Sequence, residues 1–295
     1  MASPFGGVGT ALITPFQQDR ALDLDRLREF VEFQIAGGVN FLVPCGTTGE
    51  SATMTDAEQF EVIAATIQAA AGRVPVLAGC GGNNTAEVIE KGRHLKSMGV
   101  THILSVSPYY NRPTQDGIYE HYQAIRRQTG LEIMLYSVQA RTGSNVLPET
   151  VARLAREKII FAIKEASGSI TQIQKICQLT GDGLQVFSGD DSLTLPVIAA
   201  GGVGVVSVAS NVVPGPMREW VDTLLAGDFA QARRQLKPLL PLFEALFVEA
   251  NPIPVKGAAS QLGLMDATFR LPMVPPTENT MHLLKNAMGP FAAAR

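Results

Sequence analysis

Short apolar runs alternate with longer amphipathic segments along most of this chain. The apolar runs are rich in Val, Ile and Leu and occupy residues 8–14, 41–44, 76–79, 103–107, 133–138, 159–164, 184–188 and 204–208. Short, continuously apolar runs are typical of strands that are buried on both faces, as in a parallel sheet. The pattern therefore predicts eight buried strands.

Helical patterns lie between these runs. Residues 23–36 place apolar side chains on one face, with Asp23 as the predicted N-cap. Thr55 and Glu58 have the spacing of a capping box at the start of residues 55–70. Gly99 ends a helix over 85–98, and Pro148 begins another. Further helices are predicted over 117–128, 170–179, 193–200 and 216–226.

Eight strand–helix units in alternation predict an α/β fold of the (β/α)8 TIM-barrel type. A doubly wound open sheet is the alternative, and its nucleotide-binding forms favour a GxGxxG turn after the first strand. Gly7 and Gly9 are followed by Thr10-Ala11-Leu12, so the third glycine is missing. After residue 226 the alternation ends, and helices are predicted over 229–247, 255–262 and 277–288. We expect a barrel over 1–226 and a C-terminal helical layer over 227–295 packed on it.

One uncharged stretch, residues 192–217, is long enough to cross a membrane. Several Pro and Gly residues interrupt it, so we predict a short buried helix, a tight turn and a buried strand. The first seven residues lack the basic region and apolar core of a secretory signal, which favours a cytoplasmic protein without membrane contact.

Charge and cysteine content exclude several classes of function. The chain has 24 Lys and Arg against 27 Asp and Glu, without the clustered basic excess of a nucleic-acid-binding protein. Its cysteines, Cys45, Cys80 and Cys177, lie far apart and form no CxxC pair, so neither a disulfide framework nor a zinc site is indicated. A reducing compartment fits this usage.

No metal site is predicted. The histidines (His94, His102, His121 and His282) have no ligand spacing among them. Adjacent carboxylates at Asp190 and Asp191 suggest a metal, but we interpret them as a helix-start cap and a turn.

A lysine ends the sixth apolar run. In barrels of this type the active groups lie at the C-terminal ends of the strands. Lys164 follows five apolar residues, and burial of its ammonium favours the neutral, nucleophilic amine. The alternative is a lysine whose head reaches from the strand end to water.

Neighbouring strand ends carry groups that complement an amine. Tyr136 ends the fifth run and is followed by Arg141, which together supply a proton-relaying phenol and a carboxylate-binding guanidinium. After the second run, Thr47 and Thr48 lie between glycines in a loop whose N–H and O–H groups suit an anion. A packing tyrosine, a solvated arginine and a structural turn are the alternatives. Together the groups suit Schiff-base chemistry on a keto acid.

These residues carry a resemblance to the dihydrodipicolinate synthases, within the pyruvate-dependent class I aldolases that include N-acetylneuraminate lyase. The shared motifs are residues 46–51 (GTTGES), 108–113 (PYYNRP), 163–166 (IKEA) and 188–191 (SGDD). Residues 141–143 (RTG) after Tyr136 and 251–256 (NPIPVK) resemble the synthase more than the lyase. The resemblance covers nearly the whole chain.

The resemblance implies a reaction and a role for each site residue. The reaction is condensation of pyruvate with aspartate semialdehyde in lysine and diaminopimelate biosynthesis, without metal or organic cofactor, in a homodimer or homotetramer. It implies that Lys164 forms the imine with pyruvate and that Thr47 and Thr48 bind the pyruvate carboxylate. It also implies a proton relay of Tyr136, Thr48 and Tyr110, in which Tyr110 comes from a neighbouring subunit. Arg141 is implied to bind the semialdehyde carboxylate, and the backbone carbonyls of Gly189 and Val206 are implied to line the lysine.

One departure bears on the second substrate. The family usually has Asn and Pro where this chain has Ser137 and Gln139, which changes the setting of the loop that carries Arg141. A related pyruvate aldolase or lyase acting on a sugar acid or another keto acid is therefore an alternative. A non-catalytic barrel that senses a small carboxylate is a second, and a nucleophilic lysine argues against it.

The resemblance also suggests a site for feedback by free lysine. Its matching positions are Ser51, Ala52, Asn83, Glu87 and Tyr109. Asp56 and Gln59 stand where lysine-sensitive members have histidine, and the charge of Asp56 disfavours a ligand carboxylate. We expect lysine to inhibit weakly or not at all.

Overall fold

The computed structural model describes residues 4–291 and has the predicted fold class. Eight parallel strands belong to one sheet, in the order β2-β1-β8-β7-β6-β5-β4-β3, and C-terminal helices follow them. The strands are β1 (Gly7–Ala11), β2 (Phe41–Val43), β3 (Ala78–Gly79), β4 (His102–Val106), β5 (Glu132–Ser137), β6 (Ala162–Glu165), β7 (Gln185–Ser188) and β8 (Gly204–Ser207). The apolar runs thus predicted all eight strands.

The chain forms two compact units. A central unit comprises Leu77–Val206, and a terminal unit joins Met1–Val76 to Ser207–Arg295. The predicted division at residue 226, between a barrel and a layer packed on it, stays a prediction. Lys164 and Tyr136 belong to the central unit, and Thr47 and Thr48 belong to the terminal unit.

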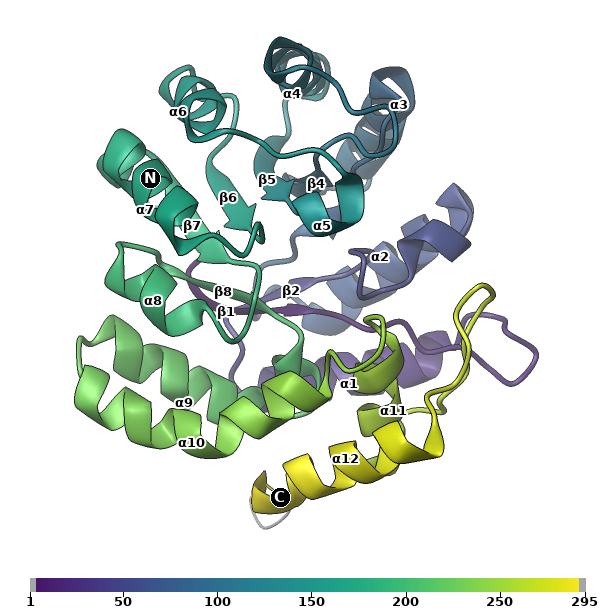
Figure 1. Cartoon of the computed structure of the whole chain (residues 1–295). Helices are drawn as coiled ribbons and strands as arrows, with labels where there is room; N and C mark the ends of the chain where they lie inside the picture. The colour runs from purple at the N-terminus through teal and green to yellow at the C-terminus, as the bar shows by residue number, and fades with distance from the viewer. Residues whose placement is uncertain (1–3, 292–295) are drawn as a thin grey trace. The chain divides into compact units, whose positions relative to one another are not determined.

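In the central unit, parallel strands carry helices on their outer side (Figure 1). The helices are α3 (Thr85–Ser97), α4 (Gln115–Thr129), α5 (Gln139–Thr142), α6 (Pro148–Arg156), α7 (Ile170–Thr180) and α8 (Thr194–Ala199), with the 3-10 turn η2 (Gly181–Gly183). Tyr136 of β5 is in register with Val106 of β4 and with Lys164 of β6, which in turn pairs with Phe187 of β7. This register fixes what surrounds Lys164.

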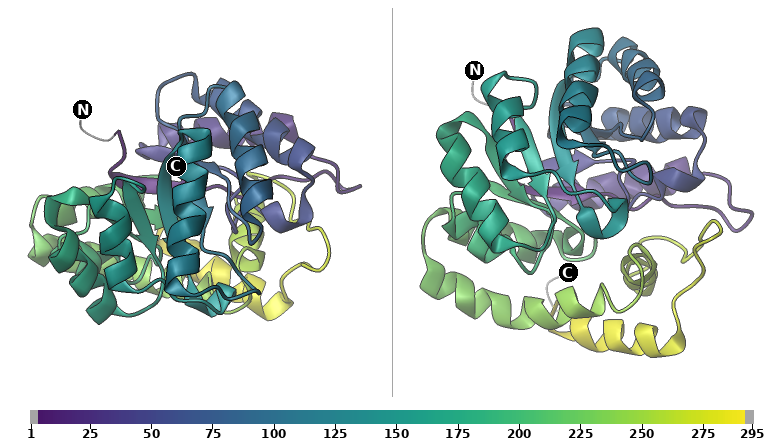
Figure 2. Two further views of the ribbon diagram at one scale, coloured as in Figure 1. Left: turned by 90° about the horizontal axis from the view of Figure 1, so that it is seen from above. Right: turned by 45° about the horizontal axis from the view of Figure 1, so that its top comes forward.

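In the terminal unit, β1 pairs with β2, and several helices pack on one another. The helices are α1 (Leu24–Ala36), α2 (Asp56–Ala70), α9 (Pro214–Leu225), α10 (Phe229–Ala245), α11 (Ile253–Gln261) and α12 (Glu278–Met288), with the 3-10 turns η1 (Ser51–Thr53), η3 (Ala209–Asn211) and η4 (Gly289–Phe291). Helix α10 lies against α9 and α12, and α12 lies against α11 (Figure 2). The fully buried Trp220 joins α9 to α10 because its indole N–H donates to the Ala232 carbonyl at 3.0 Å.

The predicted helix starts are largely confirmed. The Thr55 hydroxyl and the Glu58 carboxylate form the capping box of α2, and Asp23 caps α1 by accepting from Arg26 N–H. Pro148 occupies the first turn of α6. Helices α9 and α11 begin two residues earlier than predicted, because prolines fit a first turn and do not have to precede it.

The uncharged stretch over residues 192–217 forms α8, β8, η3 and the start of α9, which confirms the predicted helix, turn and strand. Within residues 4–291, no helix is long and apolar enough to cross a membrane.

Helix α5 was not predicted. It spans four residues, and the N–H groups of Thr142 and Gly143 donate to the carbonyls of Val138 and Gln139. This turn carries Arg141, for which the sequence predicted a loop.

Candidate active site

Lys164 is buried in the middle of three strands of the central unit. It lies on β6 with only 5 % of its surface exposed, and Glu165 continues the strand by one residue beyond the predicted end. Its Nζ lies 4.3 Å from the centre of the Tyr136 ring. Tyr136 and Phe187 are its register partners on the two neighbouring strands, and the amine lies against the Tyr136 ring.

These surroundings shift the protonation of Lys164. Burial lowers the pKa of its amine to about 8, the charge of Asp191 opposes this shift, and the charge of Arg141 adds to it. Desolvation disfavours the charged form of an amine. A substantial neutral fraction near pH 8 is what an amine nucleophile needs. Lys164 is thus buried, as the sequence pattern indicated, and its role as a nucleophile stays a prediction.

Gly189 provides the space for this side chain. It directly follows β7, and a Cβ atom there would lie 2.6 Å from the Cβ of Ala166 and 3.2 Å from the Cε of Lys164. Its N–H donates to the Glu165 carbonyl at 2.8 Å, which joins the ends of β6 and β7. Val206 lies on β8 one residue beyond Val205, the register partner of Ser188. The structure thus places Gly189 against Lys164.

Asp191 is a member of this cluster that the sequence interpretation missed. Its side chain is 2 % exposed, and its charge acts on Lys164. Asp190 forms the predicted turn, because its carboxylate accepts from the Ser192 N–H and hydroxyl at 2.9 and 2.8 Å. The predicted helix cap is wrong, since the N-cap of α8 is Leu193. Asp191 lies just beyond the end of β7, so the rule that pointed to Lys164, position at a strand end, could also have identified Asp191.

The two threonines lie in the terminal unit, in the loop over residues 46–50 between β2 and η1, which we call the threonine loop. Thr48 is 3 % exposed, and Thr47 is half-buried. Gly49 is required there because a Cβ would lie 2.9 Å from the Leu12 carbonyl oxygen. The Thr14 hydroxyl donates to the Gly49 carbonyl at 2.7 Å, so the loop is attached to the segment that follows β1.

Two residues of the C-terminal segment contact the threonine loop. The Asn251 amide Nδ2 donates to Thr48 Oγ1 at 2.9 Å, and Lys256 Nζ forms an ion pair with Glu50 Oε1 at 2.6 Å. Lys256 and Glu50 are both almost completely buried. Asn251 and Lys256 both belong to the motif over residues 251–256, but the sequence spacing did not reveal their contacts with the threonine loop.

Arg141 and Tyr110 lie at the surface of the central unit. Arg141 is exposed on α5, close enough for its charge to act on Lys164. Tyr110 is 89 % exposed and has a positive φ of 71°. A side chain this exposed is not enclosed with Lys164 within one chain. Its predicted position in a neighbouring subunit stays a prediction.

The predicted lysine-binding residues take part in local contacts. Asn83 Nδ2 donates to the Tyr109 carbonyl at 3.1 Å, and Asn84 Nδ2 donates to Glu87 Oε1 at 2.8 Å. Gln59 is buried, and its amide donates to the Ser51 carbonyl at 2.9 Å. Ser51 and Ala52 lie on η1, and Asp56 is exposed in the first turn of α2. Gln59 therefore supports the backbone of η1.

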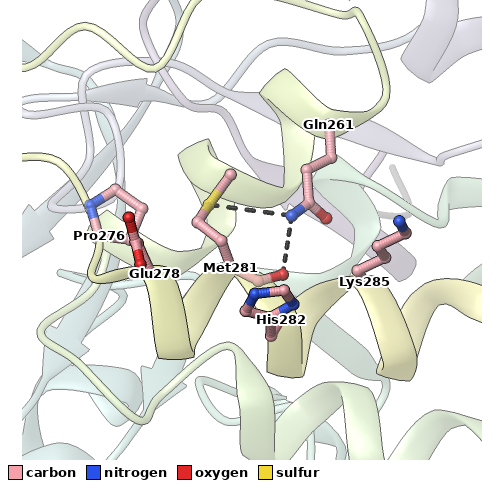
Figure 3. A pocket seen from close by; sticks show the side chains of 6 residues that line it. All are labelled: Gln261, Pro276, Glu278, Met281, His282 and Lys285. Atoms are coloured by element: carbon pink, nitrogen blue, oxygen red, sulfur yellow. Dashed lines mark hydrogen bonds between the residues drawn. The ribbon is translucent and has the colours of Figure 1, made fainter.

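A separate hollow of about 470 Å³ lies on the C-terminal helices (Figure 3). Gln261, Pro276, Glu278, Met281, His282 and Lys285 line it. None of the predicted site residues contributes to it. Among the described residues, no group of three or more His, Cys, Asp or Glu side chains is arranged to hold a metal ion.

Comparisons with known proteins found a family model, curated relatives and solved structures that match this chain. Residues 4–289 match the model of the dihydrodipicolinate synthetase family. The 4-hydroxy-tetrahydrodipicolinate synthase of Syntrophus aciditrophicus is 46 % identical over 284 residues, which cover 96 % of this chain and 97 % of that protein. The dihydrodipicolinate synthase structure from Thermotoga maritima has 42 % identity and a TM-score of 0.95, covering 97 % of this chain and 98 % of that one. The Cyanidioschyzon merolae structure, solved with lysine bound, has 39 % identity and a TM-score of 0.94, covering 97 % and 98 %.

Proposed function

Because this chain belongs to the dihydrodipicolinate synthetase family, we propose that it condenses pyruvate with aspartate semialdehyde to give 4-hydroxy-tetrahydrodipicolinate. This reaction forms a carbon–carbon bond through a covalent imine. The observation that carries the proposal is the buried amine of Lys164, whose pKa is lowered to about 8 beside the Tyr136 ring.

The proposed chemistry begins at Lys164. Its neutral amine attacks the keto carbon of pyruvate, and the carbonyl oxygen leaves as water when the imine forms. The cationic imine accepts electron density as the methyl group loses a proton, which gives an enamine. The enamine carbon attacks the aldehyde, and the substrate's own amine then displaces Lys164 as the ring closes. No metal or organic cofactor enters these steps.

Polar groups complete the proposed site. Thr47 and Thr48 bind the carboxylate of pyruvate, and Tyr136, Thr48 and Tyr110 move protons between the intermediates. The backbone carbonyls of Gly189 and Val206 line the amine. Burial of Thr48 and the contact of Gly189 with Lys164 support these roles.

Arg141 is the proposed recognition group for the second substrate. Its guanidinium can bind a carboxylate through two parallel hydrogen bonds. A rate comparison across aldehydes at fixed, saturating pyruvate tests this substrate. We expect aspartate semialdehyde to give the highest kcat/KM. A higher value for a sugar-derived aldehyde would identify the chain as a related pyruvate aldolase, and no turnover with any aldehyde would favour a carboxylate sensor.

Tyr110 supports a proposed homodimer or homotetramer in which one subunit completes the relay of its neighbour. A tyrosine that is 89 % exposed in one chain is available for such a contact. Sedimentation and activity measured over the same dilution series test the proposal. Activity should fall as the oligomer dissociates, and full specific activity in a monomer would contradict it.

Feedback by lysine is proposed to be weak or absent in this chain. The exposed carboxylate of Asp56 disfavours a ligand carboxylate near η1, and the Asn83 amide already donates to the Tyr109 carbonyl. A titration with lysine at saturating substrates tests this proposal. Half-inhibition in the micromolar range would contradict it.

A further inference from the structure

The motif over residues 251–256 has a recognisable sequence but no role in the proposed chemistry. Asn251 directly precedes the Pro252 N-cap of α11, and Lys256 lies on that helix. Residues 251–259 are all buried. A fully buried segment that carries an amide and an ammonium requires polar partners, because unpaired polar groups are costly to bury.

Both partners lie in the threonine loop. Asn251 contacts Thr48, Lys256 contacts Glu50, and only Gly49 separates these two loop residues. The Lys256 ammonium also lies 4.2 Å from the centre of the Phe16 ring. With Thr14 holding the Gly49 carbonyl, three successive residues of the loop are held from other parts of the terminal unit. These contacts restrain the position of Thr48.

The contact with Asn251 also fixes the polarity of the Thr48 hydroxyl. A hydroxyl has one hydrogen to donate and two lone pairs, and an amide NH₂ only donates. Since Nδ2 occupies one lone pair of Thr48 Oγ1, the Thr48 hydrogen points to another partner. One donor site and one acceptor site remain, which is what a hydroxyl between two relay partners requires.

We infer that Asn251 is a positioning residue that sets the direction in which Thr48 passes its proton. The inference rests on the proposed role of Thr48 in the relay. In one relay step the Thr48 hydroxyl gives its proton to the phenol oxygen of one relay tyrosine. At the same time Thr48 Oγ1 receives a proton from the phenol of the other tyrosine. The hydroxyl is regenerated, and Asn251 keeps the spare lone pair of Thr48 occupied throughout.

Two variants of Asn251 separate polarity from packing. Asn251→Asp preserves shape, but its carboxylate accepts the Thr48 hydrogen and reverses the polarity. We expect kcat to fall on the order of 10²-fold, within the range of general acid–base contributions. Asn251→Ala removes the donor but does not reverse the polarity of the hydrogen bond, because a water can donate to Thr48 in its place. We therefore expect kcat of Asn251→Ala to fall about tenfold. A residue that only fills space would give the opposite order.

The pH profile supplies a second measurement. At low pH the carboxyl introduced by Asn251→Asp is protonated and its O–H can donate to Thr48, so the ratio of its kcat to that of Asn251→Ala should rise. In a Thr48→Val background the hydroxyl is absent, and both Asn251 variants should have equal kcat. If Asn251→Asp does not fold, the Asn251→Ala effect must still vanish in that background.

Each outcome decides one proposal. Equal kcat for the two Asn251 variants at every pH, or an Asn251→Ala effect that persists with Thr48→Val, would overturn the positioning role. Failure of the wild-type protein to consume pyruvate with any aldehyde would instead overturn the proposed function. Turnover by wild type therefore makes the two failures distinguishable.

Discussion

Two buried lysines, Lys164 and Lys256, have different surroundings, and we expect different roles for them. Lys164 on β6 lies 4.3 Å from the Tyr136 ring, and Lys256 on α11 lies 4.2 Å from the Phe16 ring. Burial lowers the pKa of both amines. Lys256 forms an ion pair with Glu50 at 2.6 Å, whereas the carboxylate of Asp191 acts on Lys164 through its charge.

The difference lies in what holds the proton. Glu50 opposes the lowering of the Lys256 pKa by both its charge and its hydrogen bond. For Lys164, the charge of Asp191 raises the pKa of the amine, and the charge of Arg141 lowers it. Burial alone therefore does not identify a nucleophile. The ion pair with Glu50 fits a structural role for Lys256, whereas Lys164 carries the proposed nucleophilic role.

The largest effect is expected from removal of the nucleophile. Lys164→Ala should lower kcat by roughly 10³-fold or more, as expected for loss of a nucleophile, and leave the fold intact. Steady-state turnover with thermal unfolding checks this. Lys175→Ala is the matched control, because Lys175 is an exposed lysine in a surface ion pair. Substantial turnover by Lys164→Ala would show that another group forms the imine.

The other lysine should act on stability. Lys256→Met leaves Glu50 as a buried charge without its partner, so the free energy of unfolding should fall by about 3–5 kcal/mol. Lys256→Met combined with Glu50→Gln removes both charges and should recover most of this loss. Urea unfolding of the single and double variants measures the difference. Similar losses in both would mean that packing, not charge, dominates here.

Arg141→Ala should have a smaller effect, confined to the second substrate. Loss of a charged hydrogen-bonding group costs about 1.5–3 kcal/mol, or roughly 10–150-fold in kcat/KM for aspartate semialdehyde. The pyruvate imine should still form on Lys164. Arg156→Ala, on the exposed side of α6, is the control. Unchanged kcat/KM in Arg141→Ala would indicate a different aldehyde.

The smallest effects concern pH. Because imine formation needs neutral Lys164, kcat/KM for pyruvate should rise with pH through about 8. The Asp191 charge raises the Lys164 pKa, so Asp191→Asn should move this rise to lower pH. The Arg141 charge lowers it, so Arg141→Gln should move the rise to higher pH. Shifts in the same direction would contradict the electrostatic account.

Most of the fold was predictable because local patterns determine it. Eight apolar runs became eight strands, and the capping box at Thr55 and the proline at Pro148 marked helix starts correctly. The errors have local causes too. Prolines were placed before α9 and α11 although they fit inside the first turn, and α5 is too short to show helical periodicity.

Part of the candidate site was beyond sequence patterns. Lys164 and Tyr136 were predicted as site residues because active groups of such barrels lie at strand ends. Asn251 and Thr48 are 203 residues apart, and Lys256 and Glu50 are 206 apart. No local spacing encodes such contacts, so only the tertiary structure reveals them. Asp191 was misread because two adjacent carboxylates also fit a turn.

Trapping of the imine tests the comparison of the two lysines most directly. The protein is incubated with pyruvate and borohydride, which reduces an imine to a stable secondary amine, and the modified peptide is identified by mass spectrometry. We predict one pyruvate-derived adduct, on Lys164, and none on Lys256. No adduct, or an adduct on Lys256 or another lysine, would contradict the assignment of Lys164 as the nucleophile.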